Sequence, residues 1–177
     1  MKFKQFNFKK VKSTNQTAIR IIKKNNHDFS IINTETQTGG RGQYGRKWIS
    51  SKGNVFLSFF FKLNKINFSM ETLTKKNCLL VKRVVSNFYG KKITFKKPND
   101  LLIDGKKICG ILQEKIKKLD KDFLIVGIGF NLVKNPTIPN YPTTNLYKIT
   151  NKKIDKSKFI ELLKKNFEKF LSKYYKN

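Results

Sequence analysis

Residues 37–48 read QTGGRGQYGRKW and lie between two apolar segments, Phe29 to Ile32 and Val55 to Phe61. The stretch contains four of the ten glycines, two of the four arginines and the only tryptophan of the chain. Glycines at this density allow the backbone to approach a ligand closely and make its N–H groups available. Paired arginines suit a phosphate or carboxylate, because the guanidinium group grips oxyanions in a fixed geometry. We therefore interpret the stretch as a ligand-binding loop that joins two strands, in preference to a flexible basic linker.

Length and composition predict one folded domain. The 177 residues, of which 38% are hydrophobic and sixteen are phenylalanine, form a chain long enough to bury a core. The longest uncharged apolar run, Phe123 to Leu132, is too short to span a bilayer, and the N-terminal residues lack a signal-peptide core. Cys78 and Cys109 are far apart and have no metal-ligand spacing, which is typical of a reducing compartment. We expect a cytoplasmic protein that does not enter a membrane.

The net charge of +28 raises the alternative of a nucleic-acid-binding protein. Counterion release alone would give such a chain some affinity for polyanions. However, 35 of the 39 basic residues are lysines, and they are scattered over the whole length of the chain. Dispersed lysine is more typical of a solvated surface than of a defined nucleic-acid interface. We expect no specific DNA binding; the alternative predicts salt-sensitive affinity for DNA or RNA.

Residue alternation and apolar runs predict the strands of a sheet. Residues 3–11 alternate between apolar and polar, whereas residues 54–63 are almost continuously apolar, a pattern typical of a central strand. Asp104-Gly105 has the composition of a two-residue hairpin turn. The expected strands are Phe3–Val11, Phe29–Thr34, Asn54–Leu63, Ile93–Phe95, Lys106–Glu114 and Phe123–Leu132.

Helical spacing of apolar residues predicts helices in three places. The first follows the capping residues Ser13-Thr14-Asn15, and the second covers Glu71–Tyr89 and ends at Gly90. The third covers Ser157–Tyr175 with Ser157 as its cap, and the Pro-containing segment before it, Asn135 to Tyr147, is expected to be a loop. Together these patterns indicate an α+β fold, a mixed β-sheet packed against helices, with no internal repeat and no linker.

The loop motif Gly40-Arg41-Gly42-x-x-Gly45-Arg46-x-Trp48, preceded by Gln37, resembles the GRGRxGRxW signature of the biotin protein ligases. Further segments resemble other blocks of this family in the same order, and the resemblance covers about residues 3 to 175. These segments are Ser13-Thr14-Asn15, Lys97-Pro98-Asn99-Asp100 with Lys107-x-x-Gly110-Ile111-Leu112-x-Glu114, and Gly127-Ile128-Gly129-x-Asn131. The resemblance implies a biotin/lipoate ligase-like catalytic domain that fills residues 1–177, with no N-terminal helix-turn-helix and no small C-terminal β-barrel.

The resemblance also implies roles for individual residues. Lys107 and Arg41 would be catalytic, because positive charge there would offset the charge that develops on carboxylate and α-phosphate oxygens. The biotin-binding residues would be Ser13, Thr14, Asn15, Gln37, Arg41, Gly42, Gln43, Lys107 and Gly110, and the ATP- or adenylate-binding residues Gly40, Arg46, Trp48, Asn99 and Asn131. From the residues alone, Ser13-Thr14-Asn15 could equally be a helix cap and Lys107 one exposed lysine among many. The sequence does not identify metal ligands.

The activity that the resemblance implies is a two-step acyl transfer. Biotin would react with ATP, in the presence of Mg²⁺, to give biotinyl-5′-AMP, and the biotinyl group would then pass to a lysine of a biotin carboxyl carrier protein, a part of acetyl-CoA carboxylase. The alternatives are a lipoate or octanoate ligase-type acyltransferase and a biotin-binding remnant without transfer activity. Which carboxylase is served, and whether the chain forms a homodimer, stay open.

Two positions depart from the family pattern. Gln43 stands where many members have a second arginine in the glycine loop, which predicts that the adenylate is held less tightly. Lys97 stands where the family has a tryptophan before Pro98, which predicts altered packing beside the nucleotide.

Overall fold

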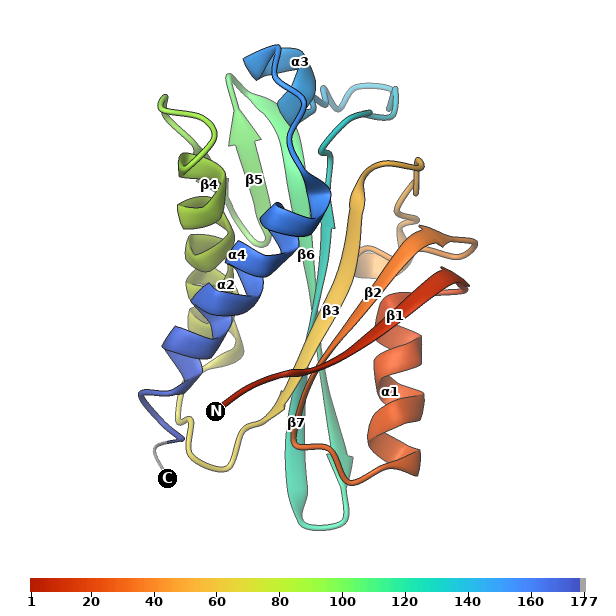
Figure 1. Cartoon of the computed structure of the whole chain (residues 1–177), viewed down its shortest axis with the longest axis vertical. Helices are drawn as coiled ribbons and strands as arrows, with labels where there is room; N and C mark the ends of the chain where they lie inside the picture. Colours follow the sequence, from red (N-terminus) through yellow and green to blue (C-terminus); the bar gives the residue numbers. More distant parts are fainter. Residues whose placement is uncertain (176–177) are drawn as a thin grey trace.

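A single seven-stranded sheet forms the centre of the computed structural model, which describes residues 1–175 (Figure 1). The strand order is β1-β2-β3-β7-β6-β5-β4; β1 and β2 are parallel and all other neighbours are antiparallel. The strands are β1 (Lys4–Val11), β2 (Phe29–Gln37), β3 (Val55–Lys62), β4 (Thr94–Lys96), β5 (Asp100–Ile103), β6 (Lys106–Lys118) and β7 (Lys121–Phe130). The predicted mixed sheet is therefore confirmed; the last two residues of the expected 1–177 domain lie outside the described residues.

Helices cover the two faces of the sheet unequally. α2 (Met70–Ser86) and α4 (Lys156–Leu171) pack side by side on one face, and α1 (Thr14–Lys24) packs on the other (Figure 1). The short helix α3 (Leu146–Thr150) and the 3₁₀ turn η1 (Gln43–Gly45) lie in connections. Within residues 1–175, none of the helices combines the length and the apolar character that crossing a membrane requires.

The apolar run of β3 explains how the two layers are held to the sheet. Its odd-numbered residues, among them Phe59, pack in the large cluster beneath α2 and α4, where the Phe59 ring stacks on Phe167 with centroids 4.1 Å apart. Phe60 points to the opposite face and packs with Ala18 and Ile22 of α1. Because both faces of β3 are covered, apolar residues do not alternate with polar ones along it.

On the α1 side, the apolar cluster beneath α1 includes Phe60 of β3, and the next β3 residue on this face is the polar Ser58. Ser58 pairs with Gly127 across β3 and β7, and Gly129 of β7 pairs with Gly110 of β6. Glycine inside a strand usually marks a place where another group comes close to the backbone. This part of the sheet presents few large side chains, so the fold leaves space above it.

Several local predictions need correction. Ser13 occupies the N-cap position of α1, but its side chain makes no capping hydrogen bond. The cap of α4 is Asp155, whose carboxylate accepts from the Ser157 N–H at 2.8 Å, so Ser157 lies inside the helix. α2 ends at Ser86 and is capped by Asn87 rather than by Gly90, because Asn87 bonds back to the last turn through both its backbone and its side chain.

Other connections agree with the sequence or extend it. The Asp104-Gly105 turn is confirmed, with φ of 49° and 72°, the left-handed values that a two-residue hairpin of this type needs. β2 continues to Gln37, beyond the predicted end at Thr34, because its last residues pair with Lys10 and Val11 of β1. The expected loop from Asn135 gives way to α3 at Leu146.

Replacement of Phe59 by alanine is expected to lower the free energy of unfolding by about 3–5 kcal/mol, because it removes a fully buried ring and leaves a cavity against Phe167. Urea unfolding followed by circular dichroism measures the change. Phe8→Ala is the control: Phe8 is 36% exposed on the outer strand β1, and its loss should cost less than about 1 kcal/mol. Equal losses for the two variants would contradict this account of the core.

Candidate functional site

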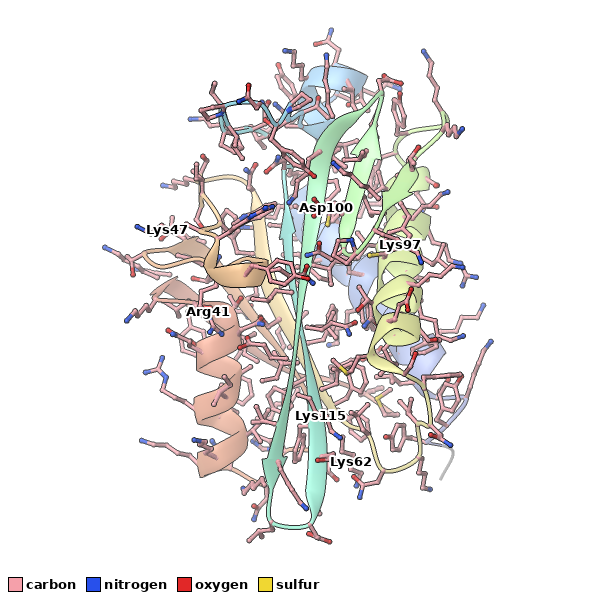
Figure 2. All side chains as sticks on the ribbon, turned by 180° about the vertical axis from the view of Figure 1, so that it is seen from behind. Arg41, Lys47, Lys62, Lys97, Asp100 and Lys115 are labelled. Carbon is pink, nitrogen blue, oxygen red and sulfur yellow. The ribbon has the colours of Figure 1, made fainter. Side chains whose placement is uncertain are left out.

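A cavity of about 710 Å³ occupies the space above the glycine-rich part of the sheet. Its walls come from the start of α1, the loop after β2, the segment from Lys96 through β6, and the loop after β7. Figure 2 views this side of the molecule, with α4 behind the sheet. The predicted site residues that line it are Ser13, Thr14, Asn15, Gln37, Arg41, Gly42, Gln43, Arg46, Trp48, Asn99, Lys107, Gly110 and Asn131.

Gly40 is the one predicted site residue that is not part of the cavity lining among the described residues. Its carbonyl accepts a hydrogen bond of 2.9 Å from the Trp48 N–H. A Cβ at position 40 would lie only 2.6 Å from the Trp48 carbonyl oxygen, so the chain passes itself too closely here for any other residue. Gly40 therefore affects the site indirectly, by allowing the two ends of the loop to pack against each other.

One end of the cavity is a buried network of polar side chains. The backbone N–H and the hydroxyl of Thr14 lie 2.9 and 3.2 Å from the Gln37 Oε1 atom, to which both can donate. The Ser58 hydroxyl lies 2.7 Å from Thr14 Oγ1 and 2.5 Å from Asn15 Oδ1. Because a hydroxyl has a single hydrogen, these groups can exchange partners and turn toward a ligand that offers its own donors and acceptors.

The glycines of β6 and β7 make room for the walls of the cavity. A Cβ at Gly127 would lie 2.2 Å from Asn15 Oδ1. A Cβ at Gly129 or Gly110 would lie 2.3 or 2.8 Å from carbon atoms of the Trp48 indole. Since real Cβ atoms do not approach other atoms so closely, only glycine allows Trp48 and Asn15 to lie where they do.

The other end of the cavity contains a charged cluster. The Lys107 Nζ atom lies 2.8 Å from Asp100 Oδ1, and both side chains are less than one-fifth exposed. The Tyr141 hydroxyl donates to Asp100 Oδ2 at 2.6 Å, and the Lys107 Nζ atom lies 5.4 Å from the ring centroids of Trp48 and Tyr141. Burial, then the hydrogen bond to Asp100 and its charge, raise the pKa of Tyr141 to about 12, so this hydroxyl keeps its proton and stays a donor.

The glycine loop carries its own charged contact. One guanidinium nitrogen of Arg41 lies 2.7 and 2.6 Å from the two carboxylate oxygens of Glu114, on β6. The Asn15 Nδ2 atom donates to the same carboxylate at 2.7 Å. Arg46 and Lys47 follow in the loop, are exposed, and line the cavity. Figure 2 labels Arg41 and Lys47 of this loop, and Asp100 of the charged cluster at the other end.

Sequence reasoning missed four residues of this arrangement: Ser58, Asp100, Glu114 and Tyr141. Asp100 and Glu114 belong to the segments that resemble the family, and Asp100 lies seven residues before Lys107, but neither residue is among the predicted site residues. Ser58 was hidden inside an apolar run, where a lone polar residue would have been the available signal. Tyr141 has no local signal, because backbone hydrogen bonds between Lys107 and residues 142 and 144 bring its loop to the site from far along the chain.

The donor set for a metal is limited. Among residues 1–175, no group of three or more His, Cys, Asp or Glu side chains is arranged to hold an ion. The cavity does contain two oxygen groups that suit a hard cation: the Asp100 carboxylate and the Asn131 Oδ1 atom, which is buried without a hydrogen-bond partner among the described residues. The two thiols are unsuitable nucleophiles, since burial raises the pKa of Cys78 to about 12 and that of Cys109 well above its ordinary value.

Known proteins resemble this chain in sequence and in structure. The chain is 31% identical over 165 residues to the bifunctional ligase/repressor BirA of Bacillus subtilis (strain 168), a match that covers 89% of this chain and 50% of that protein. The chain thus spans about half the length of this relative and of the BirA of Bacillus spizizenii, to which it is 30% identical over 167 residues.

Solved structures share the fold. The biotin protein ligase from Aquifex aeolicus in complex with biotin and ATP has a TM-score of 0.80 and 30% identity, over 96% of this chain and 71% of that one. The biotin protein ligase of Leishmania major in complex with biotinyl-5-AMP has a TM-score of 0.81, over 97% of this chain and 76% of that one; at 23% identity it supports the fold alone.

Residues 7–131, which include most of the cavity wall, match the biotin/lipoate A/B protein ligase family. The match covers more than half of the chain, and it shows that the chain belongs to the biotin/lipoate A/B protein ligase family.

Proposed function

We propose that this chain is a biotin protein ligase, which forms biotinyl-5′-AMP from biotin and ATP and transfers the biotinyl group to a lysine of a biotin carboxyl carrier protein. The observation that carries the proposal is that a buried polar network and a cationic cluster lie at two ends of one cavity of about 710 Å³. The Aquifex relative, solved with biotin and ATP, supports the same two substrates. The acceptor is proposed from a related ligase of Paracoccus denitrificans that is named for acetyl-CoA carboxylase.

The polar network suits the ureido ring of biotin. Ureido N–H groups and carbonyl oxygen need acceptors and donors, which the buried Thr14, Asn15 and Ser58 and the half-buried Gln37 provide. The dithiolane ring of lipoate offers no such partners, and buried polar groups left without partners reduce affinity. This is the reason to favour biotin over the lipoate or octanoate alternative.

The charged end suits the activation step. A carboxylate oxygen of biotin would attack the α-phosphorus of ATP, forming a new P–O bond while the bond to pyrophosphate breaks. Both reactants are anionic, so cations are needed where they meet. Lys107 would move from Asp100 to the phosphate, Arg46 would approach from the glycine loop, and Trp48 would form the wall beside the nucleotide.

Mg²⁺ would add to this charge. Such ions are usually held by one or two side-chain oxygens together with the substrate phosphates, and they neutralise phosphate charge. Asp100 and the unpartnered Asn131 Oδ1 atom fit that limited role. An ion that arrives with the nucleotide needs only these few protein ligands, and not a complete protein metal site.

Transfer requires a neutral acceptor amine. The amine attacks the acyl carbon of biotinyl-5′-AMP, an amide bond forms, the bond to the phosphate oxygen breaks, and AMP leaves. No side-chain nucleophile of the ligase is needed, in keeping with two thiols that burial holds in the protonated form. We further propose that the protein is cytoplasmic and does not bind specific DNA. Its basic residues are dispersed along the chain, and most residues of the family motifs line the cavity rather than a nucleic-acid surface.

Incubation with biotin, ATP, Mg²⁺ and a biotin carboxyl carrier domain, followed by streptavidin detection, tests the proposed function. Lys107→Ala should reduce biotin-dependent ATP–pyrophosphate exchange by about 10²–10³-fold, because a buried cation at the reacting oxygens is lost. The control is Lys106→Ala, which removes an exposed neighbouring lysine and should leave the rate unchanged. A well-folded Lys107→Ala protein with normal exchange would contradict the assignment, and labelling with lipoate in place of biotin would favour the alternative.

Gly127→Ala is expected to weaken biotin binding roughly 10- to 100-fold, because its Cβ would displace Asn15 and cost a buried hydrogen bond or two. Isothermal titration with biotin measures the effect. Gly90→Ala adds the same methyl group where nothing lies within 4 Å, and it should bind biotin normally. Unchanged affinity in Gly127→Ala would mean that Asn15 does not contact biotin.

Gln43→Arg is expected to slow the release of biotinyl-5′-AMP roughly tenfold, because a guanidinium group in the loop would add a charge-assisted hydrogen bond to the adenylate. The measurement follows free biotinyl-5′-AMP by chromatography in the absence of acceptor protein. If the native chain releases the adenylate no faster than the variant, the prediction of weak retention is wrong.

A further inference from the structure

Glu114 joins two walls of the cavity. Its carboxylate accepts from Arg41 in the glycine loop and from Asn15 at the start of α1, and all of these distances are 2.7 Å or less. The side chain is only 26% exposed, although Glu114 lies on β6 at the rim of the cavity. The carboxylate is therefore held from two sides.

The glycine loop has few other attachments near its tip. Gly42 bonds to Arg46 and Trp48 bonds to Gly40, so these backbone contacts close the loop on itself. Between residues 41 and 47, the Arg41–Glu114 pair is the one side-chain hydrogen bond or ion pair to the rest of the described chain. Tyr44, at the tip, is 88% exposed and has a left-handed φ of 55°. The position of the tip thus depends on the Arg41–Glu114 pair.

We propose that Glu114 is a positioning residue that holds the glycine loop over the cavity through Arg41, and that this anchor sets how long the activated intermediate is retained. The second half of the proposal rests on the proposed ligase function. Gln43 brings no charge to the loop, so the loop depends on the pair that Arg41 forms with the sheet. Asn15 fixes the same carboxylate, and through it the anchor is connected to the polar end of the cavity.

An arginine-specific protease tests the anchor without any ligand. The chain has four arginines: Arg41 and Arg46 lie in the loop, whereas Arg20 and Arg83 lie in α1 and α2 and serve as internal references for global unfolding. In Glu114→Gln, cleavage after Arg41 and Arg46 should become about tenfold faster, equivalent to about 1.4 kcal/mol, with no change at Arg20 or Arg83. Unchanged loop cleavage would overturn the proposal. Equal acceleration at all four sites would also overturn it, since the role would then be general stability.

Two further variants sharpen the test. Glu161→Gln neutralises a carboxylate that pairs with Lys165 on α4, and it should leave loop cleavage unchanged. Arg41→Gln breaks the anchor from the other side, so cleavage after Arg46 should accelerate as in Glu114→Gln. The double variant should show no further acceleration, because both changes remove the same contact. Additive effects would mean that the two residues act independently, and would contradict the anchor.

The retention half has a separate readout. With biotin and ATP, Glu114→Gln should release about tenfold more biotinyl-5′-AMP for each biotinyl group transferred, and an unchanged ratio would refute this half. If the native chain forms no biotinyl-5′-AMP, the proposed function fails, while the protease experiment still decides whether Glu114 anchors the loop.

Discussion

The position of the Trp48 indole against Gly110 and Gly129 is the constraint on which the site depends. Carbon atoms of the ring lie 2.8 Å from where a Cβ of residue 110 would be and 2.3 Å from where a Cβ of residue 129 would be, so the ring packs directly against the sheet backbone. This contact fixes the end of the glycine loop, forms one wall of the cavity and sets the ring 5.4 Å from the Lys107 ammonium. A larger residue at either glycine would move the tryptophan, and with it the loop that carries both arginines of the site.

The residues that stabilise the fold and the residues that line the cavity lie in different parts of the sheet. Beneath α2 and α4 it is mostly apolar, with stacked and tilted aromatic rings. On the α1 side the apolar cluster is smaller, and above it Ser58 and the strand glycines leave the cavity. A hollow lined by polar groups costs stability, and the densely packed opposite face offsets that cost.

Sequence patterns predicted most of the strands, and all of the expected site residues except Gly40 line one cavity, because the signals for both are local. The glycines of the loop, the Asp104-Gly105 turn and the apolar run of β3 can each be recognised without knowing the fold. Glu114 and Tyr141 could not be found in this way, since their roles come from partners 41 to 99 positions away in sequence. The local signal for Ser58 is its polarity within an apolar run, which alone does not name its partners. The misplaced α4 cap has a simpler origin: Asp155 and Ser157 are both good capping residues, and the pattern alone does not choose between them.

The outer position of β1 affects how the molecule behaves in a crowded solution. An unpaired strand edge can recruit a strand from another chain and so begin aggregation. Most of β1 is exposed, and it carries Lys4, Lys9 and Lys10 along eight residues. Two such edges would bring like charges together, so the lysines keep this side of the sheet from acting as a template for misassembly.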